Sequence, residues 1–167
     1  GFSDNTIFDM GAQVIAPLLS RKKILTVDTL ILTHANSDHL NGLLHIAAHF
    51  NVRQIWTNGE PAASRGYADF MKIIRERKIQ APELRDLLGD HKWGDVGVEL
   101  LYPPPDFMDR RQMEKWRVAN NNSLVIRIRF GAVSFLIPGD IMKGAEMELV
   151  ETSGERLKST VLFSPHH

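Results

Sequence analysis

The chain has 167 residues, enough for one ordinary domain with a buried core, and its 43% apolar and 24% charged residues are typical of globular proteins. Its 20 basic and 20 acidic side chains cancel, so net charge neither favours nor excludes a nucleic-acid partner. The absence of cysteine excludes disulfides, thiolate zinc sites and a cysteine nucleophile. No apolar run approaches the roughly 20 residues of a membrane-spanning helix and no signal peptide is present, which predicts a soluble chain.

Strands and helices are predicted to alternate along the chain, an α/β pattern. The predicted strands are residues 6–8, 27–33, 52–57, 95–102, 123–130, 133–137 and 159–163. The predicted helices are residues 12–19, 42–50, 67–77 and 142–152, and the polar segment 106–118 is expected to be helix or loop. No repeat or linker interrupts this series, so residues 1–167 are predicted to form a single domain.

The most informative stretch is residues 33–42, T-H-A-N-S-D-H-L-N-G, at the end of the predicted strand 27–33. It places His34, Asp38 and His39 within six positions. Nitrogen and oxygen ligands at the end of a buried strand suit a metal ion. Taken alone, the motif is also compatible with residues that cap the helix that follows, although the metal site is favoured.

Two further predicted strands also end in ligand-type residues. Asp140 follows the apolar strand 133–137, and the chain closes with His166 and His167 after the strand 159–163. Helix capping does not explain three such strand ends together, so the combination favours a metal site.

Two other histidines, His45 and His49, lie four residues apart on the predicted helix 42–50. This spacing resembles a metal-binding pair, but no acidic residue accompanies them. Exposed imidazoles are ordinary on an amphipathic helix. We therefore expect this pair to lie away from the metal site.

The order of these motifs resembles the metallo-β-lactamase fold, and more narrowly the soluble domain of the ComEC-type DNA-internalization competence proteins. The motifs are F-D-M-G at 8–11, T-H-A-N-S-D-H-L-N-G at 33–42, N-N-N-S-L-V at 120–125, L-I-P-G-D at 136–140 and P-H-H at 165–167. The resemblance spans nearly the whole chain. It implies an αββα sandwich, two mixed sheets with helices on their outer faces and a metal site along one edge. The strands that normally open this fold are expected to be missing.

The resemblance also implies a set of metal ligands for up to two ions. One half-site would comprise His34, Asn36 and Asn120, and the other Asp38, His39 and one of His166 or His167, with Asp140 as the bridging carboxylate. Asp38 and Asp140 are the expected catalytic residues. Asn36 stands where the family motif His-x-His-x-Asp-His has its second histidine, and Asn120 lies where a further histidine is usual. Because oxygen ligands favour Mn²⁺ or Mg²⁺ and imidazole favours Zn²⁺, we expect Mn²⁺, with Zn²⁺ or Mg²⁺ as alternatives.

The function implied by the resemblance is cleavage of DNA phosphodiesters during DNA uptake, with degradation of the strand that is not imported. The chain would then be a fragment of a larger bacterial inner-membrane protein, a soluble domain on its periplasmic or extracellular side. Its partners would be DNA and the transmembrane channel of the same protein, and the fragment itself would not contact lipid. The residues alone support only metal-assisted hydrolysis. A different hydrolase of this fold and an inactive, metal-poor DNA-binding module are the alternatives.

Overall fold

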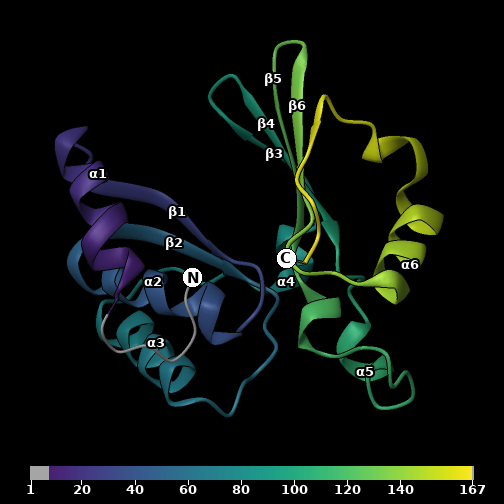
Figure 1. Ribbon diagram of the computed structural model, residues 1–167, viewed down its shortest axis with the longest axis horizontal. Helices are drawn as coiled ribbons and strands as arrows, with labels where there is room; N and C mark the ends of the chain where they lie inside the picture. The colour runs from purple at the N-terminus through teal and green to yellow at the C-terminus, as the bar shows by residue number, and fades with distance from the viewer. Residues whose placement is uncertain (1–7, 167) are drawn as a thin grey trace. The chain divides into compact units, whose positions relative to one another are not determined.

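The structure, a computed structural model, describes residues 8–166 and divides into two compact units, residues 1–82 and 83–167 (Figure 1). Most of the predicted strand 6–8 lies outside the described residues, as does His167. Within residues 8–166, no helix has both the length and the apolar character needed to cross a membrane. The single domain predicted over residues 1–167 stays a prediction.

The first unit is built on two parallel strands, β1 (Thr26–Leu32) and β2 (Asn51–Thr57). Parallel strands need a crossover connection, and α2 (Ser37–His49) supplies it. Figure 1 shows α2 between this strand pair and a further helix, α3 (Arg65–Glu76). The π-helix η1 (Gly11–Ile15) continues directly into α1 (Ala16–Arg21).

The core of the first unit fixes α2 against the strands. Leu40 and Ile46 of α2 and Phe70 of α3 are buried in one cluster with Leu30 of β1 and Ile55 of β2. Each such side chain contributes about 1.5–3 kcal/mol when it is fully buried. The start of α2 is therefore held at a fixed position relative to the carboxyl end of β1.

The second unit contains a mixed sheet with the strand order β3-β4-β5-β6-β7. Neighbouring strands are antiparallel except β6 and β7, which are parallel. The strands are β3 (Gly89–Trp93), β4 (Val96–Tyr102), β5 (Val125–Phe130), β6 (Val133–Ile137) and β7 (Val161–Leu162). The helices are α4 (Leu84–Leu87), α5 (Phe107–Arg110), the 3₁₀ turn η2 (Ala119–Asn122), α6 (Lys143–Ser153) and the 3₁₀ turn η3 (Gly154–Leu157).

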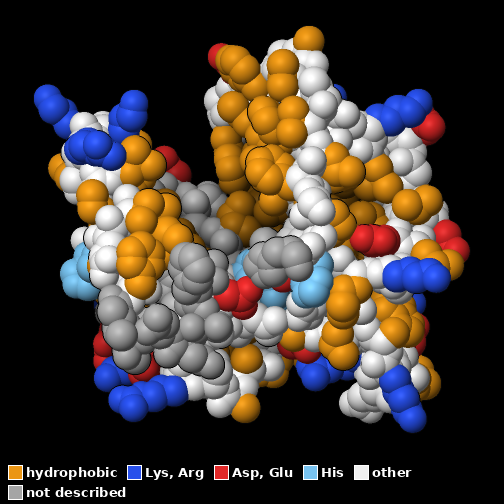
Figure 2. Space-filling model, viewed as in Figure 1, with side chains coloured by type: hydrophobic (Ala, Val, Ile, Leu, Met, Phe, Trp, Pro, Cys, Tyr) orange, Lys and Arg blue, Asp and Glu red, His pale blue; other side chains and the backbone are white. Residues whose placement is uncertain are grey.

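The two faces of this sheet differ in what covers them. On one face Leu149 of α6 packs in a buried cluster with Leu136 of β6. Because side chains alternate along a strand, Phe130, Val133 and Phe135 point to the other face, where all three are exposed. Figure 2 shows hydrophobic side chains gathered over these strands.

The predicted elements from residue 27 onward are present, and the largest difference in bounds concerns α2. The helix begins at Ser37 rather than at Gly42. Asn36 is its N-cap in an extended conformation, and the Asn36 carbonyl oxygen accepts the backbone N–H groups of His39 and Leu40. Asn-Ser-Asp is a typical helix start, and it extends the helix beyond its apolar periodicity.

Smaller differences have similar local causes. The edge strand β3 was not predicted, because its sequence G-D-H-K-W lacks apolar alternation. The strand β7 is limited to Val161 and Leu162, although the apolar run is longer. The predicted helix 12–19 is present as η1 followed by α1.

Candidate metal site

Three ligand-type side chains of the first unit meet where β1 leads into α2. The ring centroids of His34 and His39 are 4.3 Å apart, and a ring nitrogen of each lies within 4.8 Å of the other. Asp38 Oδ2 lies 3.3 Å from His39 Nε2. The structure thus brings two imidazoles and one carboxylate together at a strand end.

The local backbone explains why these side chains converge. His34 follows the end of β1 directly, whereas Asp38 and His39 lie in the first turn of α2. A carboxylate is favourable there because the start of a helix carries a partial positive charge. Thr33 Oγ1 lies 3.2 Å from His34 Nδ1 and restrains the ring. Asn36, also a predicted ligand, forms the cap between these positions, and its side chain makes no capping hydrogen bond.

The segment 8–11 packs against α2 at Gly42 and His45. A Cβ atom on Gly11 would collide with the carbonyl oxygen of Gly42, so only glycine allows η1 and α2 to approach this closely. Asp9 Oδ1 accepts the backbone N–H of Ala12 at 3.0 Å, and its Oδ2 lies 4.0 Å from His45 Nδ1. The F-D-M-G motif therefore has a packing role that holds the helix of Asp38 and His39.

The second histidine pair of the first unit has a different environment. His45 and His49 stack on α2 with ring centroids 4.2 Å apart, and His49 Nδ1 lies 2.9 Å from the carbonyl oxygen of His45. Within residues 8–166, neither belongs to a group of three or more ligand-type side chains. This agrees with the expectation that the pair lies away from the metal site.

The other predicted ligands belong to the second unit. Asp140 lies in the turn between β6 and α6, and Asn120 lies in η2. His166 is exposed, and its backbone N–H donates to the carbonyl oxygen of Gly139 at 3.3 Å. His167 lies outside the described residues.

Two polar residues that the sequence reasoning missed contact the Asp140 turn. The backbone N–H of Asp140 donates to Ser123 Oγ at 3.1 Å, and that of Met142 donates to Asn121 Oδ1 at 2.7 Å. The only sequence signal was a run of Asn and Ser immediately before a strand, residue types that often bond to nearby backbone.

An ionic network fixes the segment that precedes η2. The buried guanidinium of Arg117 donates from Nη2 to Glu148 at 2.6 Å, from Nε to Glu114 at 2.5 Å and from Nη1 to Tyr102 Oη at 3.0 Å. The Tyr102 hydroxyl in turn donates to Glu148 Oε2 at 2.8 Å. Burial alone would raise the pKa of Glu148, but the hydrogen bonds from Arg117 and Tyr102 outweigh it and lower the pKa. The polar segment 106–118 is thereby tied to β4 and α6.

A mostly apolar pocket of about 330 Å³ adjoins the first unit's ligands. Leu19, Leu30 and Leu43 line it, and Asp38 and His39 contribute polar groups. A small number of polar groups in a largely apolar pocket is typical of ligand sites.

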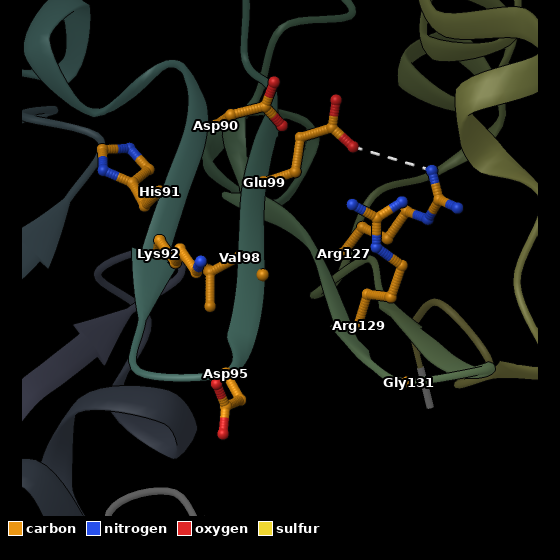
Figure 3. A pocket seen from close by; sticks show the side chains of 10 residues that line it. Asp90, His91, Lys92, Asp95, Val98, Glu99, Arg127, Arg129 and Gly131 are labelled. Carbon is orange, nitrogen blue, oxygen red and sulfur yellow. Dashed lines mark ion pairs between the residues drawn. The ribbon is translucent and has the colours of Figure 1, made fainter.

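A polar groove of about 600 Å³ lies on the second unit's sheet, lined by residues of β3, β4 and β5 and of the turns that follow β3 and β5 (Figure 3). Its charged lining residues are Asp90, Lys92, Asp95, Glu99, Arg127 and Arg129. Glu99 lies 3.7 Å from Arg127, the ion pair drawn in Figure 3. Because three basic and three acidic side chains balance, the groove has no net charge with which to attract an anion.

Comparisons with known proteins match nearly the whole chain. The model of the metallo-β-lactamase superfamily matches residues 3–165 and confirms the predicted fold class. The chain is 28% identical over 163 residues to ComE operon protein 3 of Bacillus subtilis (strain 168), and 27% identical over 166 residues to competence protein ComA of Neisseria gonorrhoeae. Each alignment covers 96% of this chain but only 19% and 20% of the respective relative, so the chain spans about a fifth of their length.

Among solved structures, the chain is similar to CmlA, a diiron β-hydroxylase from Streptomyces venezuelae. The identity is 23% and the TM-score 0.45, and the similarity covers 78% of this chain and 24% of CmlA.

Proposed function

The chain belongs to the metallo-β-lactamase superfamily, and on that premise we propose that it is a metal-dependent hydrolase that cleaves DNA phosphodiesters. The observation that carries the proposal is the convergence of His34, Asp38 and His39 at the end of β1. Family membership supports the hydrolase class, whereas the DNA substrate rests on the resemblance to competence proteins and on the competence protein among the relatives.

The donor set of the first unit fits a divalent ion. Imidazole nitrogens and a carboxylate oxygen are ligands for both Zn²⁺ and Mn²⁺. Thr33 restrains His34 through Nδ1, so we assign Nε2 of His34 to the ion. From the second unit we assign Asp140, Asn120 and one of the terminal histidines, His166 or His167, as metal ligands, with Asn36 as an oxygen ligand from the first.

The chain's own residues would bind and orient the reacting groups. The chemistry that the ion supplies is polarisation of a phosphoryl oxygen and acidification of a water molecule. Asp38, 3.3 Å from His39, fixes the His39 ring and adds negative charge that favours a cation. Asp140 would supply a further carboxylate ligand. No serine or cysteine nucleophile is required.

The proposed biological setting follows from the relatives. One of them is named a competence protein and the other a ComE operon protein, and each is about five times as long as this chain. We propose that the domain degrades the strand that is not imported during DNA uptake, beside a transmembrane channel of the same protein. It would lie on the periplasmic or extracellular side of a bacterial inner-membrane protein.

The metal and substrate are tested together by DNA cleavage. The 167-residue chain is incubated with labelled linear DNA and with plasmid, in Mn²⁺, Mg²⁺ or Zn²⁺, next to the variants His39→Ala and Asp140→Ala. His49→Ala is the matched control, because it removes an exposed imidazole from the same helix, α2. We expect Mn²⁺-dependent cleavage by the parent and by His49→Ala, and a loss of 100-fold or more, on the order expected when a metal site is disrupted, in the other two.

The same assay separates the alternatives. Cleavage that survives Asp140→Ala, or that needs Zn²⁺ alone, contradicts the assignment. Hydrolysis of a lactone or thioester without DNA cleavage indicates another hydrolase of this fold. Binding of metal and DNA without turnover indicates a binding module.

A further inference from the structure

The turn that carries Asp140 is held by side chains from the segment just before β5. Two of its backbone N–H groups, those of Asp140 and Met142, donate to Ser123 Oγ at 3.1 Å and Asn121 Oδ1 at 2.7 Å. These bonds join segments about twenty residues apart. Asp140 is therefore bracketed on both sides by fixed backbone groups.

The two side chains that hold the turn are themselves fixed. Ser123 Oγ donates to the carbonyl oxygen of Asn120 at 2.7 Å while it accepts from Asp140. Asn121 Nδ2 donates to the carbonyl oxygen of Trp116 at 2.6 Å. Ser123 is 0% and Asn121 4% exposed, so water does not compete for these bonds. Each side chain acts as donor on one side and acceptor on the other, which determines its orientation.

We propose that Asn121 and Ser123 are positioning residues that set the metal affinity of the site through the backbone of Asp140. One hydroxyl, that of Ser123, joins the backbones of Asn120 and Asp140, the two predicted ligands that flank β5 and β6. Asn121 holds the backbone of Met142, two residues after Asp140, and connects the turn to Trp116, the neighbour of Arg117 in the ionic network. This inference rests on the proposed function, because it requires Asp140 to bind the ion.

Groups that orient metal ligands typically change metal affinity by about 10–100-fold when they are removed. Ser123 and Asn121 act on the backbone and not on the carboxylate itself, so we expect the lower end of that range. Ser123→Ala and Asn121→Ala should each weaken Mn²⁺ binding by about 10-fold. Ser123→Thr keeps the hydroxyl and should restore affinity.

A matched control separates positioning from a general loss of stability. Ser134 is also a buried serine of the second unit, and its Oγ accepts the backbone N–H of Thr160 at 3.1 Å, away from the Asp140 turn. Ser134→Ala removes the same group from the same unit and should leave Mn²⁺ affinity unchanged.

The experiment measures Mn²⁺ dissociation constants by calorimetry and by the EPR signal of free Mn²⁺, on the 167-residue chain at a temperature well below unfolding. Circular dichroism confirms that each variant is folded. If Asp140→Ala binds Mn²⁺ as tightly as the parent, the role of Asp140 in the proposed function is wrong. If Asp140→Ala loses affinity but Ser123→Ala and Asn121→Ala do not, or if Ser134→Ala loses as much as they do, the positioning role is overturned. Should Ser123→Thr not fold, the comparison of Asn121→Ala with Ser134→Ala still decides the matter.

Discussion

Replacing Arg117 by methionine is expected to destabilise the second unit strongly. The substitution keeps much of the side-chain volume but removes the bonds to Glu148 at 2.6 Å, Glu114 at 2.5 Å and Tyr102 at 3.0 Å. Loss of one partner from a buried ion pair costs about 3–5 kcal/mol, because the other charge stays buried. Arg110 Nη1 still lies 2.7 Å from Glu148 and offsets part of this loss, so we expect about 3 kcal/mol.

Thermal unfolding followed by circular dichroism at pH 7 measures this effect. For a chain of this size each kcal/mol shifts the midpoint by about 2–4 °C, so Arg117→Met should unfold about 6–12 °C below the parent. Arg65→Met is the control, because Arg65 is 96% exposed and its pair with Asp69 contributes little. The double variant Arg117→Met with Glu148→Met should recover part of the loss, since no carboxylate of that pair is left buried and unpaired. A single variant that unfolds at the parent's temperature would refute this reasoning.

Two further predictions concern pH and the packing of α2. The folded state lowers the pKa of Glu148, so the stability that its carboxylate contributes is full above the unfolded pKa of about 4.3 and is lost as pH falls through the lower folded pKa. The difference in the free energy of unfolding between the parent and Arg117→Met, measured in urea, should therefore shrink below about pH 4.3. A difference that is independent of pH would argue against an ionised pair. Gly11→Ala should lower the free energy of unfolding by about 1–3 kcal/mol, since its Cβ collides with the carbonyl oxygen of Gly42. Gly66→Ala, in α3 with only ordinary contacts around the added Cβ, should be neutral or stabilising, and equal effects of the two substitutions would be inconsistent with the close approach of η1 and α2.

Apolar periodicity was sufficient to predict the strands and helices that form the two cores. The buried run of β1 and the amphipathic face of α3 both leave a clear pattern in the sequence. The edge strand β3 leaves no such pattern, because much of it is exposed to solvent and its side chains need not be apolar. The start of α2 depended on the cap at Asn36, a signal separate from hydrophobicity.

The candidate site was predictable only where ligand-type residues follow a strand directly. His34, Asp38 and His39 lie within six positions, so local structure alone brings them together. The burial of Arg117 depends on Glu148, which lies 31 residues further along the chain. Local sequence therefore shows only a polar segment there.

The roles of the asparagine run were equally hidden from the sequence. Asn120 and Asn121 are chemically identical neighbours, yet the Asn121 side chain bridges Trp116 and Met142. The 3₁₀ geometry of η2 and the position of α6 determine which of the two amide side chains points to the Asp140 turn. Neither of these is encoded in the motif itself.

Anomalous scattering at the manganese edge, from crystals of the 167-residue chain soaked in Mn²⁺, tests the central claim most directly. We expect an anomalous peak within coordination distance of a ring nitrogen of His34 or His39 and of the carboxylate of Asp38. A peak only at the His45 and His49 pair, or none beside His34 and His39 at saturating Mn²⁺, would contradict it.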